Sequence, residues 1–193
     1  RPLVWFDLEA DTADERHGVH VYLWGVAIER DGPLEPEFVW SDGGPERDAG
    51  VWRRFLDHAA TVLERHPRAP WVHYTNYEPT WVRKYVERHG DPRGIAARVL
   101  EALYDLHARA VTPCVRLPLR SYGSKHVAPF AGFSWSNPEA GSQWSLAQYR
   151  RARKSGDPAE RERLLAEIAR YNADDLEAMR AVWRWLETHA PRA

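Results

Sequence analysis

The chain has 193 residues, enough for one domain with a substantial core, since domains average about 150 residues. Its apolar fraction of 44 % and its ten tryptophans exclude a disordered segment and supply large side chains for that core. The 27 basic and 28 acidic residues nearly balance, so a global positive field cannot attract a polyanion partner, which must be bound locally by metal ions or a basic patch.

The single cysteine, Cys114, excludes an internal disulfide and a thiolate metal cluster. A free thiol fits a reducing compartment, so we expect a cytoplasmic protein. No apolar run approaches the roughly 20 residues of a membrane span. The start at Arg1 has neither an initiator methionine nor a signal peptide, and we therefore expect a domain taken from a longer chain.

Apolar runs at the start of the chain predict three strands, over 3–8, 20–29 and 36–40. The polar stretch over 10–18 suits a turn that makes the first two strands antiparallel. A helical rhythm of apolar residues covers 46–66, and a short strand follows over 71–74. Because a helix precedes this fourth strand, we expect it to lie parallel to the first strand through a right-handed crossover.

Helices are predicted for most of the second half of the chain, over 79–89, 95–108, 145–154 and 159–187. The stretch 111–137 is rich in proline and glycine, and we expect it to be irregular apart from one short helix over 124–130. The predicted fold class is therefore α/β, with a mixed sheet of an antiparallel meander plus a parallel strand, flanked by helices.

Asp7 and Glu9 stand at i and i+2 at the end of the first predicted strand, so their side chains project from the same face. Carboxylates at the edge of an apolar strand lose hydration, which a cation, protons or hydrogen-bond donors must offset. Oxygen ligands alone favour Mg²⁺ or Mn²⁺ over zinc. The alternative interpretation is that Asp7 caps a turn while Glu9 is solvated.

A second pair of candidate residues lies far along the chain, in the last predicted helix. Tyr171 and Asp175 are i and i+4, so they share a face, and the apolar residues on that face direct Asp175 toward the sheet. Asp174 lies about 100° away and is expected to be the exposed member of the aspartate pair. The alternative is a tyrosine packed in the core beside a surface aspartate.

The strand Val4-Trp-Phe-Asp-Leu-Glu9 and the helix motif Tyr171-x-x-x-Asp175 resemble the first and third exonuclease motifs of the DEDD superfamily, in its tyrosine subtype. Four segments also resemble the YprB-like, predicted RecB-family nuclease type of ribonuclease-H-like domain: 73–78, 104–107, 121–127 and 171–175. The resemblance spans nearly the whole chain. It implies a ribonuclease-H-like sheet flanked by helices, two divalent cations and 3′–5′ polarity.

One departure from the family pattern concerns the second motif. The superfamily usually supplies an aspartate there, whereas this chain has Glu78 after Asn76 and Tyr77. Glutamate can ligate a metal directly or through water, but its additional methylene moves the carboxylate, and a misplacement of about 1 Å can cost about 10²-fold in rate. Asp105 is a candidate substitute ligand; a hydrogen-bonded structural aspartate is the alternative.

The resemblance implies a two-metal mechanism in which four carboxylates hold two Mg²⁺ or Mn²⁺ ions: Asp7, Glu9, Asp175 and Glu78. Such ions activate the attacking water and stabilise the leaving 3′ oxygen. Tyr171 would orient that water through its hydroxyl without ionising, since a phenol has a pKa near ~10. These five residues are therefore predicted to be catalytic.

Two basic clusters are candidates for binding a polyanion. We predict that the first, in the irregular segment, contacts backbone phosphates, with Lys125 foremost, followed by Arg120, Arg116 and His126. The second cluster consists of Arg150, Arg151, Arg153 and Lys154. We interpret it as a solvated helix face, because Arg and Lys are abundant on protein surfaces. Trp135 and Trp144 are candidates for stacking on bases, although core packing is the better interpretation for any single tryptophan.

We therefore predict that residues 1–193 form a single ribonuclease-H-like nuclease domain of a longer nuclease- or helicase-type chain, whose other domains would be partners. The predicted activity is metal-dependent 3′–5′ exonuclease hydrolysis of single-stranded DNA or RNA, with DNA favoured. One alternative is an endonuclease of the same fold, since the fold does not decide how the strand enters. Another is a catalytically degenerate module that binds nucleic acid or a partner protein during DNA processing. Glu78 favours that module, whereas the intact first and third motifs favour the enzyme.

Overall fold

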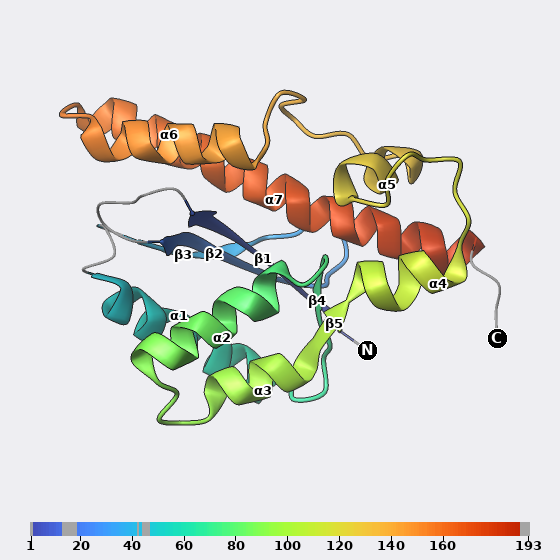
Figure 1. Cartoon of the computed structure of the whole chain (residues 1–193), viewed down its shortest axis with the longest axis horizontal. Helices are drawn as coiled ribbons and strands as arrows, with labels where there is room; N and C mark the ends of the chain where they lie inside the picture. Colours follow the sequence, from blue (N-terminus) through green and yellow to red (C-terminus); the bar gives the residue numbers. More distant parts are fainter. Residues whose placement is uncertain (1, 13–18, 42, 44–46, 190–193) are drawn as a thin grey trace.

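The computed structural model describes residues 2–12, 19–41, 43 and 47–189 (Figure 1). Its centre is a mixed sheet of five strands in the order β3-β2-β1-β4-β5. The strands are β1 (Val4–Asp11), β2 (His20–Ile28), β3 (Glu37–Trp40), β4 (Trp71–His73) and β5 (Leu103–Asp105). β1, β2 and β3 pair antiparallel, and β4 and β5 continue the sheet parallel to β1. The predicted mixed sheet, with its meander and parallel strand, is confirmed.

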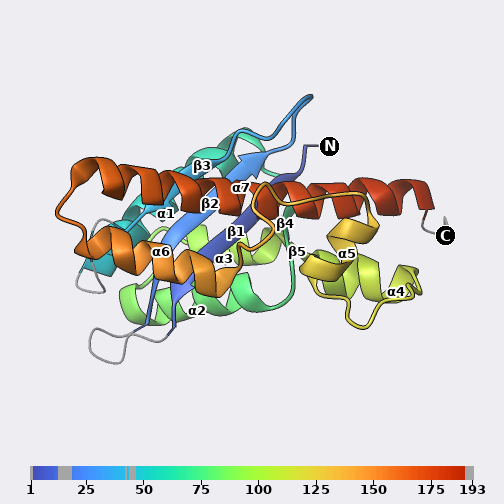
Figure 2. The same ribbon diagram turned by 90° about the horizontal axis from the view of Figure 1, so that it is seen from above.

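Helices cover both faces of this sheet (Figure 1). One face is covered by α1 (Asp48–Arg65), α2 (Tyr77–His89) and α3 (Ile95–Ala102). On the opposite face lie α5 (Ser124–Phe130), α6 (Ser142–Lys154) and α7 (Pro158–His189). Between α3 and α5 the chain forms the short helical segments η2 (His107–Val111) and α4 (Thr112–Cys114), and Cys114 is exposed. Figure 2 shows α7 running along the length of the molecule, across the sheet. No helix within the described ranges is both long and apolar enough to cross a membrane.

β1 separates two cores because successive side chains of a strand point to opposite faces. Val4, Phe6 and Leu8 pack into the cluster formed with α1, α2 and α3. Trp5 points the other way, into the cluster formed with α7. Asp7 and Glu9 lie two and four residues after Trp5, so their side chains point to the same face of the sheet as Trp5. β1 therefore directs both carboxylates toward α6 and α7.

Two predictions about secondary structure are wrong. The helix predicted over 95–108 ends at Ala102, because the next three residues form β5 and pair with the edge of β4. Local apolar spacing did not reveal this strand, since its stabilisation comes from backbone pairing with a distant segment. The segment predicted to be irregular from 111 begins instead with helical backbone that extends to Cys114.

The boundaries of the other elements differ from expectation by a few residues. β1 extends to Asp11, so the turn predicted over 10–18 begins later, and most of it lies outside the described residues. The last helix runs from Pro158 to His189 and the helix before it begins at Ser142, both longer than predicted.

The second basic cluster is only partly the solvated face that the sequence predicted. Arg151, Arg153 and Lys154 are exposed. Arg150 instead forms a bidentate salt bridge with Asp11, in which Nε and Nη2 donate to the two carboxylate oxygens at 2.9 and 2.7 Å. Asp11 is fully buried at the end of β1, so this pair ties α6 to the strand that carries the candidate site.

Replacing Arg150 should therefore destabilise the fold more than replacing its exposed neighbours. For Arg150→Met we expect the free energy of unfolding to fall by about 2 kcal/mol, because a buried carboxylate loses charged hydrogen bonds. Arg153→Met is the control, with an expected change within about 0.5 kcal/mol. Urea unfolding followed by circular dichroism measures both, and equal losses for the two variants would contradict this role of Arg150.

Candidate metal centre

Three carboxylates from two distant elements meet above the sheet. Asp7 and Glu9 come from β1 and Asp175 comes from α7, and one carboxylate oxygen from each lies within 4.8 Å of the others. Glu9 is buried, whereas Asp7 and Asp175 are partly exposed, so the group has an opening to solvent. The strand and helix motifs that the sequence singled out are thus brought into one place.

The amphipathic pattern of α7 explains how Asp175 reaches the sheet. Ile168, Leu176 and Met179 are buried on the side of the helix that packs against the sheet. Residues at i+3 and i+4 share a helical face, so Tyr171 and Asp175 point the same way. Tyr171 is 6 % exposed, which makes it a buried tyrosine at the edge of the carboxylate group.

Glu78 lies beside this group, in the first turn of α2. Its side chain is buried and hydrogen-bonds Asp7, and the group of three mutually close carboxylates does not include it. Oε2 of Glu78 is also 3.2 Å from Nδ1 of His73, at the end of β4. The glutamate that departs from the family pattern is therefore fixed between a first-motif aspartate and a buried histidine.

Glu9 is fixed by two hydroxyl groups. Tyr22 of β2 donates to Oε2 of Glu9 at 3.3 Å, and a hydrogen bond from Ser145 of α6 stabilises the ionised form of Glu9. The hydroxyls of Tyr22 and Ser145 are themselves 2.8 Å apart. The N-terminal part of α6 thus belongs to the surroundings of the site.

Asp175 accepts hydrogen bonds from α5 and from the loop that follows it. Nε1 of Trp135 donates to Oδ1 of Asp175 at 2.7 Å, and Nζ of Lys125 lies 3.2 Å from the same oxygen. The ammonium group also sits over two aromatic rings, 3.7 Å from the ring centroid of Trp135 and 4.6 Å from that of Tyr171. Lys125 is therefore the one member of the first basic cluster that contacts a carboxylate of the group within the described residues.

Asp174 is not the freely exposed residue that the sequence predicted. It is partly buried, and its two oxygens accept from the backbone N–H and the hydroxyl of Ser136 at 2.8 and 3.1 Å. Helical periodicity correctly turned Asp174 away from Asp175, but it could not show that a loop would pack there. Adjacent aspartates of α7 thus bind adjacent residues of one loop, at Trp135 and Ser136.

Burial and mutual repulsion raise the pKa values of the clustered carboxyl groups. The pKa of Asp7 lies well above its usual value because of burial, Asp175 and Glu78, and the pKa of Glu9 is raised by burial, Asp7 and Asp175. Burial raises the pKa of Glu78 to about 8. The pKa of Asp175 is also raised by burial, although Lys125 opposes the shift. A bound cation would therefore strongly stabilise the ionised forms of these clustered carboxyl groups.

Tyr171 is protonated in this environment. Burial, followed by the charge of Asp175, raises the pKa of its hydroxyl far above the usual value. The hydroxyl also hydrogen-bonds Asp175, which stabilises the ionised form of that carboxylate. Trp144 packs edge-on against the Tyr171 ring at a centroid distance of 6.1 Å.

The remaining candidates lie apart from the carboxylates. Asp105 accepts hydrogen bonds from the backbone N–H groups of Thr75 and Ala108 at 3.2 and 2.9 Å. Thr75 has a positive φ of 70°, so Asp105 stabilises a strained turn that leads from β4 to Glu78. This placement supports the structural alternative for Asp105.

Three basic candidates make no contact with the carboxylate group in the part of the chain that the structure describes. Nη1 of Arg116 donates to the carbonyl oxygen of Thr112 at 2.9 Å, so this side chain folds back on its own segment. Arg120 and His126 are exposed.

Four residues that orient the carboxylates are not among the site residues predicted from the sequence: His73, Tyr22, Ser145 and Asn172. Asn172 is fully buried, and its Nδ2 donates to Oδ2 of Asp7 at 2.6 Å. Two signals were present. Asn172 falls on the inward stripe of the last helix, and Gly25 is an isolated glycine in a strand, which often marks a close approach.

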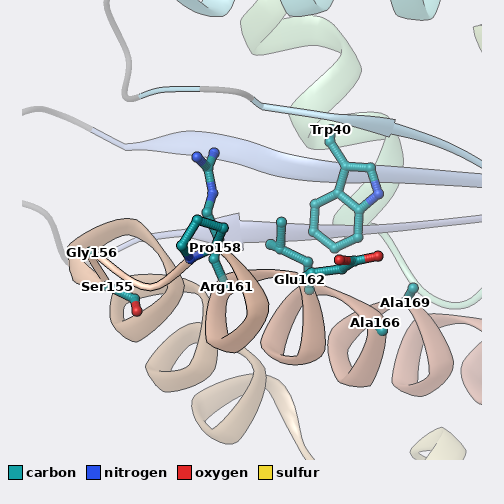
Figure 3. Close-up of a pocket in the computed structure, with 9 residues that line it drawn as sticks. Trp40, Ser155, Gly156, Pro158, Arg161, Glu162, Ala166 and Ala169 are labelled. Atoms are coloured by element: carbon teal, nitrogen blue, oxygen red, sulfur yellow. The ribbon is translucent and has the colours of Figure 1, made fainter.

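A separate groove of about 590 Å³ lies between β3 and the first turns of α7 (Figure 3). Trp40 forms one wall, and Pro158, Leu165 and Ala166 are among the residues that line the other. None of the candidate site residues lines this groove, so it is a feature distinct from the carboxylate group.

Comparison with known families gives a match to a model described as RNase_H superfamily, over residues 4–187. This range includes β1, all but the last two residues of α7, and every residue of the carboxylate group. The match confirms the ribonuclease-H-like part of the resemblance seen in the sequence. Neither curated proteins nor solved structures gave a significant match.

Proposed function

The chain belongs to the RNase_H superfamily, and from this membership and the clustered carboxylates we propose that it is a metal-dependent 3′–5′ exonuclease of the DEDD type. Its substrate is single-stranded nucleic acid, DNA in preference to RNA. The observation that carries the proposal is the convergence of Asp7, Glu9 and Asp175, whose oxygens lie within 4.8 Å of one another. The superfamily assignment by itself indicates a nuclease-type, nucleic-acid-binding domain.

The donor set fits Mg²⁺ or Mn²⁺. Asp7, Glu9 and Asp175 offer only oxygen atoms, which both cations prefer. Burial raises the pKa of all three carboxyl groups, and repulsion between carboxylates adds to the shift at Asp7 and Glu9, so a divalent cation would stabilise the ionised forms. Glu78 would add a further ligand, directly or through water. When bound, two such ions lower the pKa of an attacking water and stabilise the leaving oxygen of a phosphodiester.

The chain's own residues would place the strand and the water. Lys125 supplies a positive charge beside Asp175, suited to a backbone phosphate of the strand. Its position on the rings of Trp135 and Tyr171 holds the ammonium at the edge of the carboxylate group. The hydroxyl of Tyr171 remains protonated and donates its one O–H to Asp175, so its oxygen can accept a hydrogen bond from the attacking water and orient it, while the ring packs against Trp144.

The tyrosine subtype and the YprB-like relationship belong to the proposal as well. They rest on the segment Tyr171 to Asp175 and on the motifs around Glu78 and Lys125. We further propose that residues 1–193 are one domain of a longer DNA-processing chain in the cytoplasm, with other nuclease or helicase domains as partners.

A degenerate binding module is the second candidate function, and one observation favours it. Glu78 is buried and engaged on both sides, by Asp7 and by His73, so its carboxylate has less freedom to rearrange around an ion than an exposed one. In that case the domain would bind nucleic acid or a partner protein without cleaving.

The test is cleavage of end-labelled single-stranded DNA and RNA with Mg²⁺ or Mn²⁺, beside a chelator control. A ladder that shortens from the 3′ end supports the exonuclease and identifies its preferred polymer. Internal cuts in a circular single strand would support an endonuclease instead. Folded protein that gives no metal-dependent product on either polymer, yet retards it in a gel, would favour the binding module.

Lys125 offers a prediction about substrate binding. We expect Lys125→Met to raise KM for a single-stranded substrate about tenfold and to reduce the slope of log KM against log salt by about 0.7, the value for one phosphate contact on a single strand. Lys154→Met, at the exposed end of α6, is the matched control and should change neither quantity. An unchanged salt slope for Lys125→Met would exclude its phosphate contact.

A further inference from the structure

Asn172 makes an unusual buried contact next to the candidate metal centre. Its Nδ2 donates to Oδ2 of Asp7 at 2.6 Å, whereas its Oδ1 is buried and has no hydrogen-bond partner among the described residues. A buried polar atom without a partner costs about 1–3 kcal/mol. An apolar side chain of the same shape would avoid that cost, so the amide is not explained by packing alone.

Gly25 provides the space that Asn172 occupies. In the antiparallel pairing of β1 with β2, Gly25 lies directly opposite Asp7. A Cβ atom at Gly25 would be 2.0 Å from Oδ1 and 3.0 Å from Cγ of Asn172, closer than atoms can approach without movement. The backbone of Gly25 does not have a positive φ, so glycine is required here by space and not by backbone conformation.

We infer that Asn172 is a positioning residue that fixes the orientation of the Asp7 carboxylate, and that the absence of a side chain at Gly25 leaves the space in which the Asn172 amide lies. This inference rests on the proposed metal centre. With Oδ2 held by the amide, the Asp7 carboxylate is oriented beside Glu9 and Asp175 before a cation binds. Donors that orient metal ligands in this way typically change metal affinity by about 10–100-fold when they are removed.

The chemistry of an amide suits this position. Nδ2 donates a hydrogen bond to a carboxylate without adding charge to the three carboxylates of the group. An aspartate at position 172 would add a negative charge beside Asp7, and a lysine would add a cation that competes with the metal. A leucine has nearly the shape of asparagine but cannot donate, which makes Asn172→Leu the most informative substitution.

Calorimetric titration of the protein with Mn²⁺ alone tests the inference. We expect Asn172→Leu to weaken Mn²⁺ binding at least tenfold, and the Mn²⁺ concentration that half-activates cleavage to rise to the same extent. We expect Gly25→Ala to weaken Mn²⁺ binding similarly, although it changes no polar group, because the added methyl displaces Asn172. In the double variant the two losses should not add, since both act through one contact.

Gly156→Ala is the matched control, because a Cβ atom at Gly156 would meet no atom of the described residues within 4 Å. Thermal unfolding in chelator shows that each variant is folded, and Gly25→Ala serves if Asn172→Leu does not fold. Mn²⁺ affinities of these variants within twofold of the wild type would overturn the inference and leave Asn172 a packing residue. Absence of Mn²⁺ binding by the wild-type protein would instead overturn the proposed metal centre, and the inference with it.

Discussion

Replacing Asp175 by asparagine should abolish metal-dependent cleavage. The variant keeps the shape of the side chain but removes the charge that α7 contributes to the carboxylate group. Loss of a single electrostatic interaction in a transition state costs about 10²–10³-fold in kcat, and we expect the loss of a metal ligand to cost at least that much. Asp7→Asn should have the same effect. Single-turnover cleavage of a 3′-labelled strand measures both variants.

Asp57→Asn is the matched control for these two variants. Asp57 is an exposed residue of α1 that pairs with Arg93, and a surface pair of this kind contributes little to stability. We also expect Asp7→Asn and Asp175→Asn to melt in chelator at or above the wild-type temperature, because each relieves carboxylate repulsion. A clear fall in melting temperature for both would assign the two aspartates a structural role, and cleavage at the wild-type rate would rule them out as metal ligands.

The metal-free protein should become more stable as the pH falls from 8 to 6.5. The pKa of Glu78 is about 8 in the folded state against a usual value of 4.5, so in this window the folded state binds more protons than the unfolded state. The free energy of unfolding therefore decreases as the pH rises. We expect a change of about 1–2 kcal/mol, or about 4 °C in melting temperature, measured by calorimetry in chelator.

Two further results would check the source of this pH dependence. Glu78→Gln should flatten the profile, whereas Glu64→Gln, on the exposed face of α1, should not. Saturating Mg²⁺ should stabilise the protein more at pH 8 than at pH 6.5, because the cation competes with protons for the same oxygens. Below pH 6.5 the trend should weaken, since burial lowers the pKa of His73 and charging it destabilises the fold. A wild-type profile that rises with pH would contradict the protonation of Glu78.

Much of the fold follows from local sequence patterns. Alternating apolar residues around Trp5 and Phe6 determine a strand with two buried faces, and they place Asp7 and Glu9 on one of them. The 3.6-residue periodicity of the last helix likewise turns Tyr171 and Asp175 inward. These features could be predicted because each depends on residues that are close in sequence and on one repeating geometry.

Other features depend on contacts that no local pattern contains. β5 pairs with β4 at residues whose spacing also fits a helix, so backbone pairing with a distant segment decided between strand and helix. Lys125 was one of several basic residues in an irregular segment, and only the path of that segment brings it to Asp175.

The candidate site shows the same division. The sequence by itself determined which carboxylates are candidates for the centre. Strand alternation turns Asp7 and Glu9 to the same face of β1, and helical periodicity turns Asp175 to the buried face of α7. The tertiary structure alone decided what holds them, since Asn172 and Asp7 are 165 residues apart and meet only where α7 crosses the strand pair beside Gly25. Local geometry sets the direction of a side chain, whereas its partner depends on how whole elements pack.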